Sequence, residues 1–176
     1  GNIAEPFEKI RKASLSVIRE AAEAADNLGA ETLVIHPGFC LEKDMFEKSY
    51  EALLLSIYDL GKMQEEFSVR FAVENLGSLD CCHFRFPDFV SILRDADLAF
   101  CLDVGHANLN GVLDEFLDSK PEHVHLHDNH GVWDEHAAVG SGDIDFSSVL
   151  ELDATGIIEC MEYDAAQKSL AFLKQT

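Results

Sequence analysis

Residues 123–146 read HVHLHDNHGVWDEHAAVGSGDIDF. The first fourteen of these residues hold five of the eight histidines in the chain. His123, His125 and His127 alternate with Val124 and Leu126, which predicts a β-strand with the imidazoles on one face and the aliphatic side chains on the other. A solvated loop has no need for so much imidazole. The stretch therefore predicts a strand whose polar face lines a site.

Strand-like and helix-like segments alternate on both sides of this stretch. Apolar runs predict strands over residues 31–38, 68–77, 98–106, 123–129 and 156–163, and helical periodicity predicts helices over 6–28, 44–64, 87–94, 111–117, 146–150 and 165–174. This order favours parallel βα units in one α/β domain spanning residues 1–176. A doubly wound sheet and a (β/α)8 barrel both fit, but no Gly-rich phosphate loop supports the nucleotide-binding sheet.

The composition limits the classes of partner. The chain has 33 acidic and 13 basic residues, a formal net charge of −20, so it repels nucleic acid and anionic membranes. Five cysteines, an odd number, indicate reduced thiols. No apolar run reaches the roughly 18 residues of a membrane span. We expect a cytoplasmic protein for which nucleic acid is a disfavoured partner.

Each predicted strand carries a metal-ligand residue at or near its end. These residues are His36, Glu74, Asp103, His125 and Glu159. One such residue is more often hydrogen-bonded locally than catalytic, but five in succession are hard to explain that way. Burying carboxylates without a cationic partner is costly, and a divalent ion removes that cost. Because barrel active sites lie at the carboxyl ends of parallel strands, we predict a metal site there.

Two local spacings extend the set of ligands. In DVGH, Asp103 ends a strand and His106 follows three residues later. In DEH, Asp134 and His136 lie on the same side of an extended segment, close enough to share one ion. Either spacing is weak alone. Together with the strand ends they supply ligands for more than one metal.

The segments VIHPG, VENL, CLDVGHANL, HLHDN, DEH, GSGDIDF and IIE occur in an order that resembles the xylose isomerase-like TIM barrel superfamily, which includes sugar phosphate isomerases and epimerases and the endonuclease IV group. The resemblance covers essentially the whole chain. It implies metal contacts for His36, Glu74, Asp103, His106, His125, Asp134, His136 and Glu159.

The resemblance also implies that the barrel is incomplete. A full barrel has eight strands and usually about 250 residues, whereas five strands are predicted here. The chain resembles the C-terminal part of such a barrel, with the first three βα units absent. Whether those units are truncated or supplied by another copy stays open. Because an arc of five strands exposes two edges, we expect the chain to form a homo-oligomer or to have lost activity.

For function, the resemblance implies a divalent-metal-dependent sugar or sugar phosphate isomerase or epimerase that transfers a proton through an enediolate. Glu74 and Glu159 would exchange the proton, and His106 would lie beside the substrate hydroxyls. The remaining substrate contacts would come from His127, Asn75 and Trp133. Mn or Zn would be the metal, with Mg and Co as alternatives.

The same residues also fit two other functions. In an endonuclease IV-like enzyme acting at abasic DNA, Glu74 would bridge two zinc ions, and His106, Asp134 and His136 would bind a third. The net charge of −20 opposes this reading. The third alternative is a non-catalytic fragment that retains the metal residues.

Overall fold

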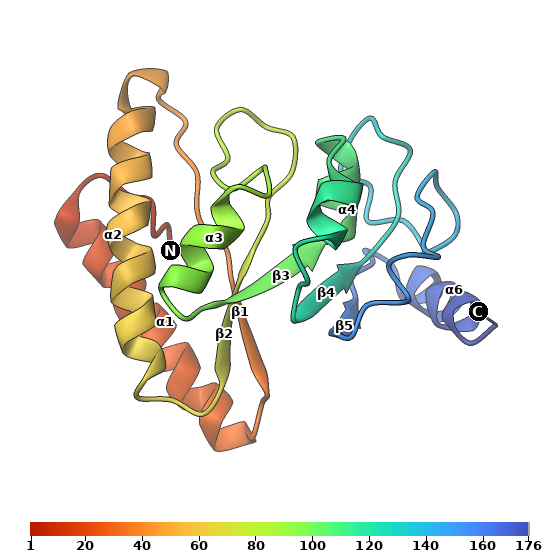
Figure 1. The fold of residues 1–176 in the computed structure, drawn as a ribbon, viewed down its shortest axis with the longest axis horizontal. Coiled ribbons are helices and arrows are strands. Elements are labelled where there is room, and N and C mark those ends of the chain that lie inside the picture. The colour runs from red at the N-terminus through yellow and green to blue at the C-terminus, as the bar shows by residue number, and fades with distance from the viewer. Residues whose placement is uncertain (176) are drawn as a thin grey trace.

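The computed structural model describes residues 1–175 and contains one parallel sheet in the order β1-β2-β3-β4-β5 (Figure 1). The strands are β1 (Thr32–Ile35), β2 (Arg70–Glu74), β3 (Ala99–Asp103), β4 (His123–Leu126) and β5 (Thr155–Ile158). Every neighbouring pair is parallel, and Asp103 lies opposite His125 in the register of β3 and β4. The five strands and their helices form part of a TIM-type barrel, as the sequence predicts.

The helices are α1 (Glu8–Leu28), α2 (Phe46–Gln64), α3 (Phe89–Asp95), α4 (Val104–Leu109), α5 (Leu113–Leu117) and α6 (Tyr163–Leu173). A 3-10 turn, Lys43–Met45, precedes α2. Four predicted helices are confirmed with small shifts at their ends, and the helix predicted over 111–117 starts at Leu113. The short helix α4 was not predicted, because its residues were expected to end a strand and begin a loop.

The helix predicted over residues 146–150 is wrong, because these residues form a turn. Ser147 N–H donates to the Asp145 side chain, and Leu150 N–H donates to the Phe146 carbonyl in a single helical turn. Serine and aspartate favour such local bonds over a continued helix. The apolar spacing that resembled a helix instead buries Phe146 and Val149 in the core.

The two faces of the sheet differ in side-chain size. The face toward the helices carries Phe71, Phe100 and Leu102 in the main hydrophobic core. The opposite face carries a small cluster of Ala72, Ala99 and Cys101, with Val34 against it. Because side chains alternate along each strand, the face with large side chains packs against the helices. The face with small side chains, called the thin face, leads to the polar residues at the strand ends.

Gln64 at the end of α2 fixes the start of β2. Its Oε1 accepts from Phe71 N–H at 2.6 Å, and its Nε2 donates to the Val69 carbonyl at 3.0 Å. Gln64→Ala leaves both buried main-chain groups without these partners, so we expect a loss of about 2 kcal/mol in the free energy of unfolding. Urea denaturation measures it. Gln167→Ala, which changes an exposed residue of α6, is the control, and an equal midpoint for the two variants would contradict the prediction.

The cysteines and the lengths of the helices bear on two further expectations. All five cysteines are free thiols, as predicted. Among residues 1–175, none of the helices combines the length and the apolar character that a membrane crossing requires. Self-association stays a prediction.

Candidate metal centre

The first cluster comprises Glu74, Asp103, His125 and Glu159, which the carboxyl ends of β2 to β5 bring together. One ligand atom from each lies within 4.8 Å of all the others. His125 Nδ1 is 2.9 Å from Glu74 Oε1 and 3.1 Å from Glu159 Oε2. Glu159 follows the last residue of β5 rather than lying within that strand. The expected convergence of strand-end residues on one centre is present in the geometry.

The carboxylates and imidazoles of the first cluster shift one another's pKa values. Burial alone raises the pKa of the Glu74 carboxyl, but hydrogen bonds with His125 and His36 outweigh it and hold that pKa well below its usual range. The hydrogen bond with His125 lowers the pKa of Glu159. Burial lowers the pKa of His125, but its contacts with Cys101, Glu159 and Glu74 raise it overall. Both glutamates are therefore ionised near neutral pH.

His36 lies at the rim of the first cluster. It follows the last residue of β1, and its Nε2 is 2.8 Å from Glu74 Oε2. Its side chain is 69% exposed, whereas that of Glu74 is 2% exposed. This position lets His36 orient Glu74 or add a ligand from the solvent side.

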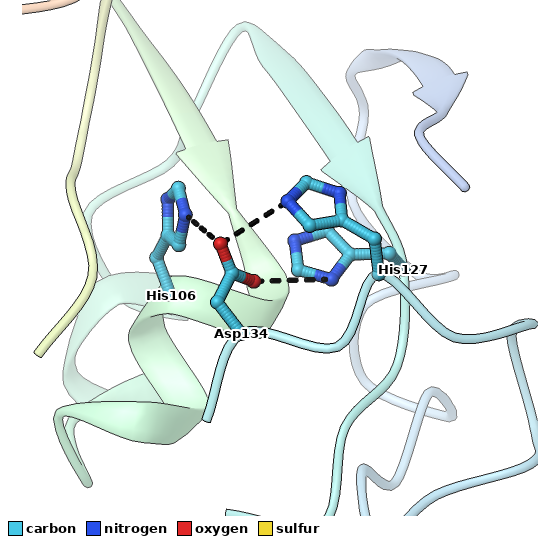
Figure 2. Close-up of side chains that lie close together, drawn as sticks. His106, His127 and Asp134 are labelled. Carbon is cyan, nitrogen blue, oxygen red and sulfur yellow. Dashed lines mark hydrogen bonds and ion pairs between the residues drawn. The ribbon is translucent and has the colours of Figure 1, made fainter. Parts of the chain in front are cut away.

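The second cluster comprises His106, His127, Asp134 and His136. Asp134 Oδ2 is 3.2 Å from His106 Nε2 and 3.1 Å from His136 Nε2. Figure 2 shows the Asp134 carboxylate between the rings of His106 and His127, and its Oδ1 is 3.9 Å from His127 Nδ1. Burial alone lowers the pKa of His106, but Asp134 and Asp103 outweigh it and raise it to about 9.

Asp103 connects the two clusters. It caps the N-terminus of α4, where its Oδ1 accepts from His106 N–H at 2.6 Å. Its two carboxylate oxygens also lie 3.0 and 3.1 Å from His127 Nε2. The cap explains why α4 begins directly after β3 and why His106 turns back toward the strand ends. The three-residue spacing in DVGH is thus the spacing of an N-cap bond.

Asp128 is a structural residue that the sequence did not reveal. Its fully buried carboxylate accepts main-chain N–H bonds from Asn129, Gly140, Gly142 and Ile144 at 2.8 to 3.2 Å. These bonds fold residues 129–144 back onto the end of β4. The loop in turn delivers Asp134 and His136 to the second cluster.

The three residues expected to contact substrate have different surroundings. The Asn75 side chain is buried and bonds both the N–H and the carbonyl of Asp103, so it positions that residue. His127 is fully buried and belongs to the second cluster. Trp133 is 63% exposed. The place of His127 in the second cluster could have been expected from sequence, because alternation puts His127 on the same face as His125.

The donor sets fit divalent cations. Within residues 1–175, none of the ion pairs made by the two clusters involves Lys or Arg, although the clusters hold four carboxylates. His127 Nδ1 and Asp134 Oδ1 are buried and have no hydrogen-bond partner in this part of the chain. A cation would satisfy these atoms and offset the negative charge.

The sequence is similar to those of several known proteins. The uncharacterized protein MJ1614 of Methanocaldococcus jannaschii is 40% identical over 149 residues, which cover 84% of this chain and 59% of that protein. A probable endonuclease 4 of Mycobacterium leprae is 24% identical, over 99% of this chain and 74% of its own length. The chain thus spans less than two thirds of the length of MJ1614.

The fold is similar to those of many solved structures. A D-tagatose 3-epimerase-like protein superposes with a TM-score of 0.90 at 29% identity, covering 99% of this chain and 72% of its own. The TTHB071 protein of Thermus thermophilus, soaked with ZnCl2, superposes with a TM-score of 0.79 at 27% identity, with the same coverage. The family model described as xylose isomerase-like TIM barrel matches residues 1–176. The chain therefore belongs to the xylose isomerase-like TIM barrel family.

Proposed function

We propose that the first cluster, with a divalent cation, isomerises or epimerises a small sugar or sugar phosphate by moving the proton next to a carbonyl. The observation that carries this proposal is the pair Glu74 and Glu159, which both lie within 3.1 Å of His125 Nδ1. Glu74 ends β2 and Glu159 follows β5, with β3 and β4 between these two strands. The two carboxylates therefore approach the same space from opposite sides.

The chain's own residues supply the proton transfer. The lowered pKa values of Glu74 and Glu159 keep both carboxylates ionised, so either can accept a proton from carbon. The opposite placement lets one remove the proton and the other return it on the other face. A bound cation would stabilise negative charge developing on the carbonyl oxygen. The similarity to a D-tagatose 3-epimerase-like protein supports a sugar substrate.

Exchange of solvent deuterium tests this proposal. We expect the chain, incubated in D2O with ketoses or ketose phosphates and Mn²⁺ or Zn²⁺, to replace the C–H next to the carbonyl by C–D, as followed by NMR. Glu74→Gln and Glu159→Gln should each slow exchange by about 10²- to 10⁴-fold, because each removes one proton-transfer group. Exposed Glu162→Gln is the matched control. Equal exchange rates in all variants would contradict the proposal.

A second candidate function is phosphodiester hydrolysis at abasic DNA. The second cluster favours it, because His106, Asp134 and His136 could hold a further ion beside the first cluster. The similarity to a probable endonuclease 4 points the same way. The net charge of −20 opposes a substrate that is bound through its phosphates. Nicking of an abasic oligonucleotide, without deuterium exchange on sugars, would favour this candidate over the first.

A further inference from the structure

We propose that Cys40 and Cys81 form a reversible disulfide that joins the loop after β1 to the loop after β2. The two loops are residues 36–42 and 75–88, and both leave the carboxyl end of the sheet. The proposal concerns neither metal cluster and does not rest on the sugar reaction. It is based on the register in which the two loops pair, on the side chain that supports this pairing and on the exposure of the thiols.

The two loops pair in an antiparallel direction. Phe39 and Cys82 form an antiparallel bridge, and Cys40 N–H donates to the Cys81 carbonyl at 2.7 Å. Because a step forward along one segment is a step back along the other, Cys40 lies directly opposite Cys81. Opposite residues joined by such a bond have Cα atoms about 5.5 Å apart, within the roughly 4.4 to 6.8 Å that a disulfide spans.

The side chain of Asn2 supports this register. Its Nδ2 donates to the Phe39 carbonyl at 2.8 Å, and its Oδ1 accepts from Phe39 N–H at 3.3 Å. The main-chain groups of Phe39 therefore point away from Cys82 and toward Asn2. Alternation along an extended segment then turns the main-chain groups of Cys40 toward Cys81, in agreement with the 2.7 Å bond. Two separate sets of bonds thus place the two cysteines opposite each other.

The Cys40 thiol is free to turn toward Cys81. Cys40 Sγ bonds the Glu42 carbonyl at 3.2 Å, and a thiol is only a weak donor, so little is lost when this bond breaks. Cys40 and Cys81 are both partly exposed. A small oxidant can therefore reach either thiol from the solvent.

The other three cysteines are less suited to this reaction. Burial and the neighbouring Cys81 thiol raise the pKa of Cys82 to about 11, so its reactive thiolate is scarce near neutral pH. A disulfide between the adjacent Cys81 and Cys82 would also close a small, strained ring. Cys101 is fully buried. Cys160 lies elsewhere, with its Sγ 3.4 Å from Ser169 Oγ of α6.

The disulfide would form by exchange with a low-molecular-weight disulfide such as oxidised glutathione. The thiolate of one cysteine attacks a sulfur of that disulfide, which forms a mixed disulfide and releases one small thiol. The thiolate of the other cysteine then attacks the protein's sulfur in the mixed disulfide and releases the second small thiol. The two cysteines lose two protons and two electrons, which end on the two released thiols. Reduced glutathione in excess reverses both steps.

The disulfide would restrain the rim of the first cluster. His36 lies in the loop of Cys40, and its Nε2 is 2.8 Å from Glu74 Oε2. The loop of Cys81 begins at Asn75, directly after Glu74. A link between the two loops closes about 40 residues of chain and restricts the unfolded state. We therefore expect oxidation to stabilise the fold and to limit the motion of the loop that carries His36.

Peptide mapping of the full chain tests the proposal. Trypsin places Cys40 in the peptide of residues 20–43, and Cys81 and Cys82 in the peptide of residues 71–85. We expect the chain treated with oxidised glutathione to contain one disulfide between these two peptides. The same link should form in Cys82→Ser, and it should be absent from Cys40→Ser and Cys81→Ser.

The melting temperature gives a second readout. The oxidised chain should melt about 5 °C or more above the reduced chain, because the link lowers the entropy of the unfolded state. This difference should be lost in Cys40→Ser. Cys160→Ser removes a cysteine outside the two loops and is the matched control, in which both the link and the difference in melting temperature should remain.

Each of the other outcomes would overturn the proposal. These are a disulfide within the 71–85 peptide, mixed disulfides with glutathione alone, and no loss of free thiols. Formation of the link in Cys81→Ser would also overturn it, because the register would then not select the pair. Circular dichroism shows whether each variant is folded. If Cys40→Ser or Cys81→Ser is unfolded, the peptide map of Cys82→Ser still decides, since only Cys81 remains in the second peptide.

Discussion

We expect replacement of Asp103 to weaken cation binding at both clusters, because its carboxylate belongs to the first cluster and contacts His127 of the second. We expect Asp103→Asn and Asp103→Ala each to weaken binding at the first cluster by about 100-fold or more, since each loses an anionic ligand. The second cluster should lose affinity by about 10- to 100-fold, because His127 loses the carboxylate that orients it. Deuterium exchange on sugars should fall below detection. Metal content after dialysis, measured by mass spectrometry, checks the first two expectations.

The two Asp103 variants differ in one respect. Asparagine caps a helix about as well as aspartate, whereas alanine does not, so only Asp103→Ala should lose a further 1 kcal/mol or so of stability through α4. Urea denaturation of the chelated proteins measures this difference. Asp95→Asn, an exposed carboxylate at the end of α3, is the control. Retention of two ions by Asp103→Asn would contradict the double role of this residue.

Replacing Asp128 will release the loop that carries Asp134 and His136. In Asp128→Asn, the side-chain amide cannot accept four N–H bonds and places a donor against some of them, so buried main-chain groups lose their partner. We expect a loss of about 3 kcal/mol or more. For a chain of this size that lowers the melting temperature by on the order of 10 °C. Differential scanning calorimetry measures the shift.

The Asp128 variant should also lose the ion of the second cluster before that of the first. Asp143→Asn changes an exposed carboxylate of the same loop and is the matched control. An unaltered melting temperature in Asp128→Asn, or equal loss of both ions, would show that the loop is held by other contacts.

The convergence of the strand-end residues of the first cluster could be predicted because it follows from general geometry. Parallel strands deliver their carboxyl ends to one edge, and alternation decides which side chains share a face. This geometry alone predicts that Glu74, Asp103 and His125 lie close together. The pairing of Asp134 with His136 was also predicted from spacing, although the left-handed backbone at His136 was not.

The roles of Asp128 and α4 could not be predicted, because both depend on bonds to main-chain groups. Nothing in the sequence separates Asp128 from the other acidic residues, since its four donors come from a loop without a repeating pattern. The α4 segment continues an apolar strand pattern, so only the cap formed by Asp103 shows where the strand stops. The bonds of Asn75 to the Asp103 backbone could not be predicted for a similar reason, and its contact with substrate stays a prediction.

Because the two faces of the sheet differ, alternate residues of the same strands serve different purposes. One set stabilises the fold, and the other leads to the candidate metal site. In β2, Phe71 and Val73 hold the helices, while Ala72 and Glu74 lie on the thin side. We expect a change in the size of Phe71 or Val73 to alter the free energy of unfolding more than the arrangement of the first cluster. Related sequences can therefore change their thermal stability through the packed face without substitutions in the candidate metal site.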